Sequence, residues 1–194
     1  MNHLEIEFKN MLNYESYTLL KSLYFKDVSP FTQTNFYMDT EDFKLRDKHI
    51  ALRIRDAGKV KEMTLKIPQQ IGVMEYNIPL DDSLLTQDFF EVETLPEPIR
   101  SELIRRNIHA PLKVFGALST ERMETEYESG LLVLDASAYL DTEDFELEYE
   151  VSDYDSGKQI FDNLLKQHNI PVSVSKNKVQ RFYDHLMELQ AKNF

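Results

Sequence analysis

The sequence has no cysteine among its 194 residues. This absence excludes disulfide bonds, thiolate zinc sites and a cysteine nucleophile. No apolar run approaches the roughly 20 residues that a membrane-spanning helix needs. The first residues also lack the basic segment followed by an apolar stretch that marks a secretory signal. We therefore expect a soluble cytoplasmic protein that does not interact with a membrane.

Basic residues are scarce relative to acidic ones. The chain carries 22 Lys and Arg against 34 Asp and Glu, a formal net charge of −12. Such a balance argues against general affinity for nucleic acid or for an anionic membrane. An anionic ligand must therefore be bound by a local cluster of basic residues. A chain of this length forms one domain by default, so we expect a single domain over residues 1–194, as a monomer or homodimer.

Alternating apolar and polar residues, joined by tight turn signals, predict a hairpin-rich antiparallel sheet. The expected strands are residues 3–10, 32–40, 49–57, 60–70, 73–79, 112–128, 131–140 and 144–152. Apolar residues at helical spacing predict helices. The expected helices are residues 13–25, 96–107, 154–168 and 176–190. No linker, repeat or low-complexity segment divides the chain.

Several expected strands have one apolar and one charged face. In the first strand, Ile6 and Phe8 alternate with Glu5, Glu7 and Lys9, and successive side chains of a strand point to opposite sides. For any single strand, an ordinary sheet with a dry and a wet side explains the pattern. The amphipathic helices, however, need an apolar surface to cover. A barrel with its apolar face outside and its charged face lining the lumen would provide that surface.

Charge sign is also sorted by strand. Acidic residues occupy positions 5–7 and 146–150, whereas basic residues occupy positions 53–55 and 66. Solvated faces usually mix the two signs. Separate acidic and basic walls suit a polyanion that is bridged to a divalent cation.

An ordered series of motifs resembles the CYTH domain, also called the triphosphate tunnel metalloenzyme family. The series comprises Glu5-x-Glu7-x-Lys9, "FYMDT" at residues 36–40, Arg53-x-Arg55, "TLK" ending at Lys66, "MEY" around Glu75, a strand with Arg122, and Glu146-x-Glu148. A lone Glu-x-Glu-x-Lys arises often by chance, whereas the ordered set spans essentially the whole chain and is much more specific. The layout resembles the short single-domain bacterial members.

The resemblance implies an α+β fold in which an eight-stranded antiparallel β-barrel forms a tunnel flanked by helices. It implies hydrolysis of a small triphosphate, such as inorganic tripolyphosphate, thiamine triphosphate or a nucleoside triphosphate, with Mg²⁺ or Mn²⁺. Two alternatives stay open. One is a class IV-type adenylate cyclase that forms cyclic AMP from ATP, and the other is a non-catalytic polyphosphate or nucleotide sensor.

The residue types fit this chemistry. Arg53 and Arg55 present planar donors to phosphate oxygens, and carboxylates suit Mg²⁺ or Mn²⁺. The expected substrate-binding residues are Lys9, Arg53, Arg55, Lys66, Arg122 and Lys176. The expected metal ligands are Glu5, Glu7, Glu146 and Glu148, and the expected catalytic residues are Glu5, Glu7, Lys9 and Glu75. We predict that Glu5, Glu7, Arg53, Arg55, Lys66, Glu146 and Glu148 point into one shared cavity.

Some of these assignments have structural alternatives. By spacing alone, a salt bridge between Arg122 and Glu124 or Glu126 is as plausible as a contact between Arg122 and phosphate. Family members often carry a second basic residue two positions earlier, where this chain has Thr120. That departure puts the substrate preference in question more than the fold.

Three further polar residues have more than one interpretation by sequence alone. Glu150 continues the acidic strand and ranks below Glu146 and Glu148 as a metal ligand. Asp135 points to the same face as Val133 and Ser137, which leaves its role as a metal ligand open. Lys176 suits phosphate binding and equally suits the start of a solvated helix.

Overall fold

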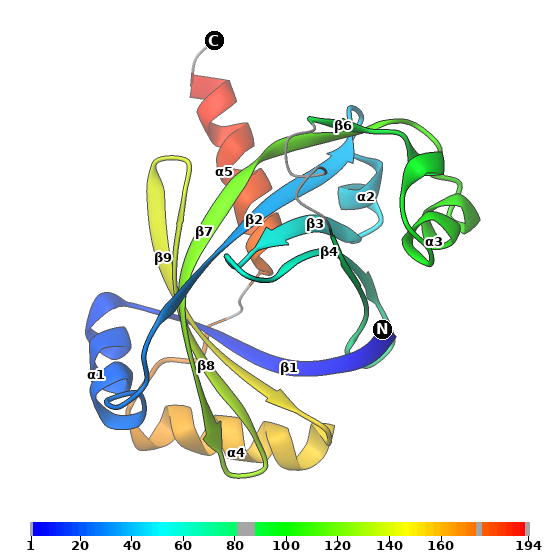
Figure 1. The fold of residues 1–194 in the computed structure, drawn as a ribbon. Coiled ribbons are helices and arrows are strands. Elements are labelled where there is room, and N and C mark those ends of the chain that lie inside the picture. Colours follow the sequence, from blue (N-terminus) through cyan, green and yellow to red (C-terminus); the bar gives the residue numbers. More distant parts are fainter. Residues whose placement is uncertain (1, 81–87, 174–175, 193–194) are drawn as a thin grey trace. The chain divides into compact units, whose positions relative to one another are not determined.

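The structure is a computed structural model that describes residues 2–80, 88–173 and 176–192 (Figure 1). Its longer strands are β1 (Asn2–Leu12), β2 (Phe31–Thr40), β3 (Ala51–Asp56), β4 (Lys61–Pro68), β5 (Val73–Pro79), β7 (Leu112–Tyr127), β8 (Gly130–Tyr139) and β9 (Thr142–Val151). Its longer helices are α1 (Tyr14–Tyr24), α3 (Ile99–Arg105), α4 (Tyr154–Gln167) and α5 (Lys178–Lys192). These elements confirm every predicted strand and helix, with ends that differ by a few residues.

Three short elements were not predicted: β6 (Phe89–Phe90), α2 (Lys44–Asp47) and the 3-10 helix η2 (Val92–Thr94). The single turn of α2 is stabilised by a residue that lies outside the helix. The buried carboxylate of Asp39, on β2, accepts hydrogen bonds from the backbone N–H groups of Leu45 and Arg46 at 2.8 and 3.0 Å. Periodicity cannot predict a helix this short, because its stability depends on that capping carboxylate.

The strands form one sheet with the order β2-β3-β4-β5-β1-β9-β8-β7-β6, and β2 pairs additionally with β7. The order of neighbours is therefore circular over eight strands, with β6 attached to β7. This strand order confirms the predicted class, an α+β fold with an eight-stranded antiparallel barrel and accompanying helices. Among the described residues, no helix combines the length and apolar character that crossing a membrane requires.

The chain divides into two compact units. Unit 1 comprises Met1–Leu4 and Thr34–Leu118, and unit 2 comprises Glu5–Gln33 and Ser119–Phe194. Strands β1, β2 and β7 each contribute residues to both units. A single domain over residues 1–194 stays a prediction.

In unit 1, the apolar faces of β3 and β4 pack beneath α3. Leu52 and Leu65 on the strands and Ile99 and Leu103 on α3 belong to one buried cluster. Each of these side chains is almost completely removed from water, and burial of a leucine-sized side chain contributes roughly 1.5–3 kcal/mol. As predicted, a helix covers the apolar side of these strands.

In unit 2, α1 and α4 pack on the apolar side of β8 and β9, and Figure 1 shows α4 lying across these two strands. Leu134 and Leu147 of the strands share a buried cluster with Leu20 of α1 and Phe161 of α4. Asn13 begins α1, because its side-chain oxygen accepts the backbone N–H of Ser16 at 2.8 Å. The charged faces of both units are thus the faces opposite these apolar clusters.

Candidate functional site

Unit 1 presents a polar surface that we call the basic face. Strand register places Arg55 opposite Asn35 of β2, and Lys66 opposite Glu75 of β5. Arg53, two residues from Arg55 on the same strand, therefore points to the same side. The full set on this face is Asn35, Tyr37, Arg53, Arg55, Glu62, Thr64, Lys66, Glu75 and Asn77. Three of the predicted substrate-binding cations, on β3 and β4, thus share one face.

Glu75 lies among these cations. The Lys66 ammonium is 3.1 Å from its carboxylate, and the Arg53 guanidinium is 3.9 Å away. Asn77 donates a hydrogen bond to it at 3.1 Å, and His3 Nε2 lies at 3.2 Å. Burial alone raises the pKa of Glu75, but Lys66 and Arg53 outweigh burial and lower that pKa to about 2. Glu75 is therefore an ionised counter-charge of the basic face, and its catalytic role stays a prediction.

Arg55 and Asn35 are joined by a hydrogen bond. Arg55 donates from Nε to Oδ1 of Asn35 at 3.2 Å, and its Nη1 lies 3.6 Å from Glu62. Within the described residues, Asn35 Nδ2 and Arg53 Nε are buried N–H donors without a hydrogen-bond partner. The basic face thus contains two buried N–H donors that form no hydrogen bond with the described protein residues.

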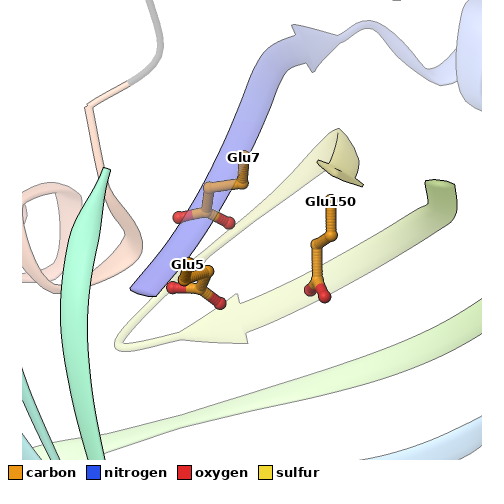
Figure 2. Close-up of side chains that lie close together, drawn as sticks. All are labelled: Glu5, Glu7 and Glu150. Atoms are coloured by element: carbon orange, nitrogen blue, oxygen red, sulfur yellow. The ribbon is translucent and has the colours of Figure 1, made fainter. Parts of the chain in front are cut away.

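Unit 2 presents an acidic trio of Glu5, Glu7 and Glu150 (Figure 2). Glu7 on β1 lies directly opposite Glu150 on β9. One carboxylate oxygen from each of the three lies within 4.8 Å of the others. The Lys9 ammonium contacts Glu7 at 2.6 Å. Burial first, and then the charge of Glu5, raise the pKa of Glu150 to about 7.

The acidic trio fits a divalent cation. Three converging carboxylates supply the hard oxygen ligands that Mg²⁺ and Mn²⁺ prefer. Burial, and then the charge of Glu5, disfavour the ionised form of Glu150 and raise its pKa. A cation placed here would favour that form. Glu5 and Glu7 were predicted metal ligands, whereas Glu150 was ranked below Glu146 and Glu148.

Glu146 and Glu148 lie in a second, more deeply buried cluster, which we call the lysine-centred network. The Lys178 ammonium of α5 contacts Glu146, and it lies 2.6 Å from Glu148 and 2.9 Å from Asp135. Burial lowers the pKa of Lys178, but these carboxylates outweigh burial and raise it well above its ordinary value. The Lys178 ammonium thus occupies the position among these carboxylates that a metal cation would take. The assignment of Glu146 and Glu148 as metal ligands stays a prediction.

Arg122 also belongs to this network. It donates two hydrogen bonds to Asp135, at 2.8 and 2.7 Å, and one to Glu148 at 2.7 Å. Its distance to Glu124 is 3.7 Å. Structural pairing of Arg122 is therefore present, with Asp135 as the main partner, and phosphate contact stays a prediction. Thr120, at the position that is often basic, shares a buried 3.0 Å hydrogen bond with the Ser137 hydroxyl.

The first turn of α5 provides a second cation. Arg181 donates to Asp144 at 2.9 Å and to Glu146 at 3.1 Å. Lys176, the predicted phosphate ligand, instead has an exposed side chain and contacts Asp184 at 2.6 Å. Sequence reasoning did not predict the buried contact of Lys178, and phosphate binding by Lys176 stays a prediction. The available signal was that Lys178 precedes buried Phe182 by one helical turn.

The predicted site residues are distributed over both units. Unit 1 holds Arg53, Arg55, Lys66 and Glu75, whereas unit 2 holds Glu5, Glu7, Lys9, Arg122, Glu146, Glu148 and Lys176. Lys9 joins the two clusters of unit 2, because its ammonium contacts Glu7 and lies 3.7 Å from Glu148. The expectation of one cavity shared by residues from both units stays a prediction.

Glu150→Gln is expected to change how stability depends on pH in metal-free protein. The folded pKa of about 7 exceeds the ordinary 4.5, so the native state binds more protons between these values and loses stability as pH rises through them. The variant lacks this loss and should be more stable than the wild type at pH 8, by roughly 1–3 kcal/mol. Urea unfolding with EDTA at pH 5 and pH 8 measures the difference. Equal pH slopes for the two proteins would contradict it.

Comparisons with known proteins agree with these features. The family profile described as the CYTH domain matches residues 3–183. YjbK of Bacillus subtilis (strain 168), whose name proposes a triphosphatase, is 40% identical over 184 residues, covering 93% of this chain and 95% of YjbK.

Solved structures show the same relationship. A Bacillus halodurans protein whose name proposes an adenylate cyclase has a TM-score of 0.83 at 33% identity, covering 94% of this chain and 98% of its own. HpAC1 from Hippeastrum, described as having a dominant triphosphatase activity, has a TM-score of 0.76 at 21% identity, covering 94% and 96% of the two chains. The last likeness supports the fold alone. With a family match over nearly its whole length and relatives of 40% and 33% identity, the chain belongs to the CYTH domain family.

Proposed function

We propose that the protein is a divalent-metal-dependent hydrolase of small triphosphates. One observation carries the proposal: arginine and lysine side chains gather on one face of unit 1, and three carboxylates converge in unit 2. The first set suits phosphoryl oxygens and the second suits a metal ion. A solvated surface with positive and negative side chains interspersed would suit neither phosphate binding nor metal binding.

Cleavage of a P–O–P anhydride requires stabilisation of negative charge on the phosphoryl groups and a positioned water. Arg53, Arg55 and Lys66 would bind non-bridging oxygens. Glu5, Glu7 and Glu150 would hold Mg²⁺ or Mn²⁺, which when bound neutralises phosphate charge and promotes ionisation of water.

Two neighbouring ion pairs would position these groups. Lys9 contacts Glu7 at 2.6 Å and so restricts the orientation of that carboxylate. Glu75 contacts Lys66 at 3.1 Å and restrains its ammonium on the basic face. Both contacts are made by the protein's own side chains, so they contribute to the orientation of these groups.

The name of one relative supports this reaction class: YjbK, which is 40% identical to this chain, has a name that proposes a triphosphatase. The name of the Bacillus halodurans protein favours the second candidate, adenylate cyclase. In that reaction the ribose 3′-hydroxyl attacks instead of water, so the two reactions differ in their products.

Product analysis separates the candidates. Purified protein is incubated with tripolyphosphate, ATP or thiamine triphosphate, each with Mg²⁺ or Mn²⁺, and products are identified by ³¹P NMR and chromatography. We expect metal-dependent release of orthophosphate. Cyclic AMP with pyrophosphate would instead establish a cyclase, and binding without turnover would establish a sensor.

Arg53→Ala is expected to weaken tripolyphosphate binding by about tenfold or more, because a charge-assisted contact contributes roughly 1.5–3 kcal/mol. Arg53→Ala removes both repulsion from the other cations of the basic face and an attraction to Glu75 at 3.9 Å, so the ligand-free melting temperature should change little. Thermal shift with tripolyphosphate measures both effects. Lys158→Ala, which removes an exposed ion pair with Asp162, is the control. A lowered ligand-free melting temperature with an intact shift would make Arg53 a structural residue.

A further inference from the structure

The side chain of Asn35 is buried, but only one end of its carboxamide forms a hydrogen bond with the described protein residues. Its exposed fraction is 1%. Oδ1 accepts the Arg55 Nε hydrogen bond at 3.2 Å, whereas Nδ2 has no hydrogen-bond partner among the described residues. Buried polar groups in proteins are nearly always hydrogen-bonded. An unused donor at this depth therefore calls for a specific explanation.

Arg53 provides an independent second observation. Its Nε is also a buried donor without a hydrogen-bond partner in the described ranges. Arg53 lies two residues from Arg55 on β3, and Arg55 lies directly opposite Asn35. Arg53 and Asn35 are therefore diagonal neighbours on one face of a strand pair, a spacing that long side chains bridge. Two strands thus bring two unused N–H donors to one region of the basic face.

Another asparagine on the same face behaves differently. Asn77 accepts the Thr64 hydroxyl hydrogen bond at 2.8 Å through Oδ1, and it donates from Nδ2 to Glu75 at 3.1 Å. Both ends of this carboxamide have protein partners. The unused amide donor is therefore a property of the β2 side of the basic face, and not of asparagines on this face in general.

The chemistry of the two atoms identifies the kind of ligand. N–H donors bind oxygen lone pairs and cannot coordinate a metal cation. Guanidinium groups beside them favour an anionic oxygen. Because Arg55 holds the oxygen end of the Asn35 carboxamide, the amino end is oriented before a ligand arrives.

We propose that Asn35 is a substrate-binding residue, which donates from Nδ2 to a non-bridging phosphoryl oxygen while Arg53 Nε donates to the same phosphoryl group. This inference rests on the proposed function, because it names a further contact with the same triphosphate. It assigns to β2 a neutral donor in addition to the charged residues of β3 and β4.

The test compares two buried asparagines. Asn35→Ala should weaken metal-free tripolyphosphate binding, measured by isothermal titration calorimetry, by about tenfold or more, with little change in ligand-free melting temperature. Asn10 is equally buried at 1% exposure, but its carboxamide hydrogen-bonds to Met11, Pro171 and Ser173 at 2.7–3.1 Å. Asn10→Ala should therefore lower the melting temperature and leave the affinity of the folded protein unchanged. Wild-type affinity in Asn35→Ala would overturn the proposal.

A double-mutant cycle separates direct contact from an effect through Arg55. Asn35→Ala is measured alone and in an Arg55→Gln background. Direct donation predicts that Asn35→Ala still lowers affinity in that background. If its effect disappears there, Asn35 acts only by positioning Arg55 and the proposal is wrong. If the wild type does not bind tripolyphosphate at all, the proposed function fails as well, whereas binding by the wild type with equal affinity in Asn35→Ala refutes this inference alone.

Discussion

Glu7→Gln is expected to lower kcat/KM for metal-activated tripolyphosphate hydrolysis by about 100-fold or more, because a catalytic metal supplies several kcal/mol of charge stabilisation. Glu7 lies opposite Glu150 and within the acidic trio. Glutamine keeps the size of the side chain and removes its charge. The Mn²⁺ concentration needed for half-maximal rate should rise as well. Rates measured over a range of Mn²⁺ concentrations give both quantities.

A matched control comes from β9. Glu143 is exposed and lies on the strand that carries Glu150, but at an odd position, so it points to the other face. Glu143→Gln makes the same chemical change outside the acidic trio and should keep the wild-type rate and metal requirement. Unchanged kinetics in Glu7→Gln would remove Glu7 from the metal site.

Lys178→Met should destabilise the protein by about 3–5 kcal/mol, the usual cost of removing one partner from a buried ion-pair cluster. The Lys178 ammonium contacts Asp135, Glu146 and Glu148, all of them buried. Arg122, Arg181 and Lys9 would then remain near these carboxylates. Urea unfolding at pH 7 measures the loss.

Lys176→Met, two residues earlier, is the control for that variant. Its exposed pair with Asp184 predicts a change of about 1 kcal/mol or less. A second measurement uses the metal itself. One oxygen each from Asp135, Glu146 and Glu148 lies within 4.8 Å of the others, so Mg²⁺ or Mn²⁺ should stabilise Lys178→Met more than it stabilises the wild type. Wild-type stability in Lys178→Met would show that the lysine-centred network does not contribute to folding.

Strand alternation predicted the sheet and its faces well, because period two is a local property of the chain. It could not rank the glutamates of β9. Glu146, Glu148 and Glu150 all point to one side, and only the register with β1 decides which of them meets Glu7. That register comes from pairing between residues more than a hundred positions apart, which no local pattern specifies.

The buried position of Lys178 was not predicted, for a related reason. The predicted helix began at residue 176, whereas α5 begins at Lys178. A shift of two residues turns a helix face by more than half a turn. Phase relative to Phe182, which is buried, was the better guide than the start of the helix, because Lys178 and Phe182 lie on one stripe.

The proposal that the basic face and the acidic trio bind a metal–triphosphate complex is tested most directly by isothermal titration calorimetry. The ligand is the Mg²⁺ complex of a non-hydrolysable triphosphate analogue. Wild type, Arg53→Ala of the basic face and Glu7→Gln of the acidic trio are compared, with Lys158→Ala as the control. The account predicts that each of the first two variants weakens binding by about tenfold or more, while the control binds as the wild type does. Wild-type affinity in both Arg53→Ala and Glu7→Gln would contradict it.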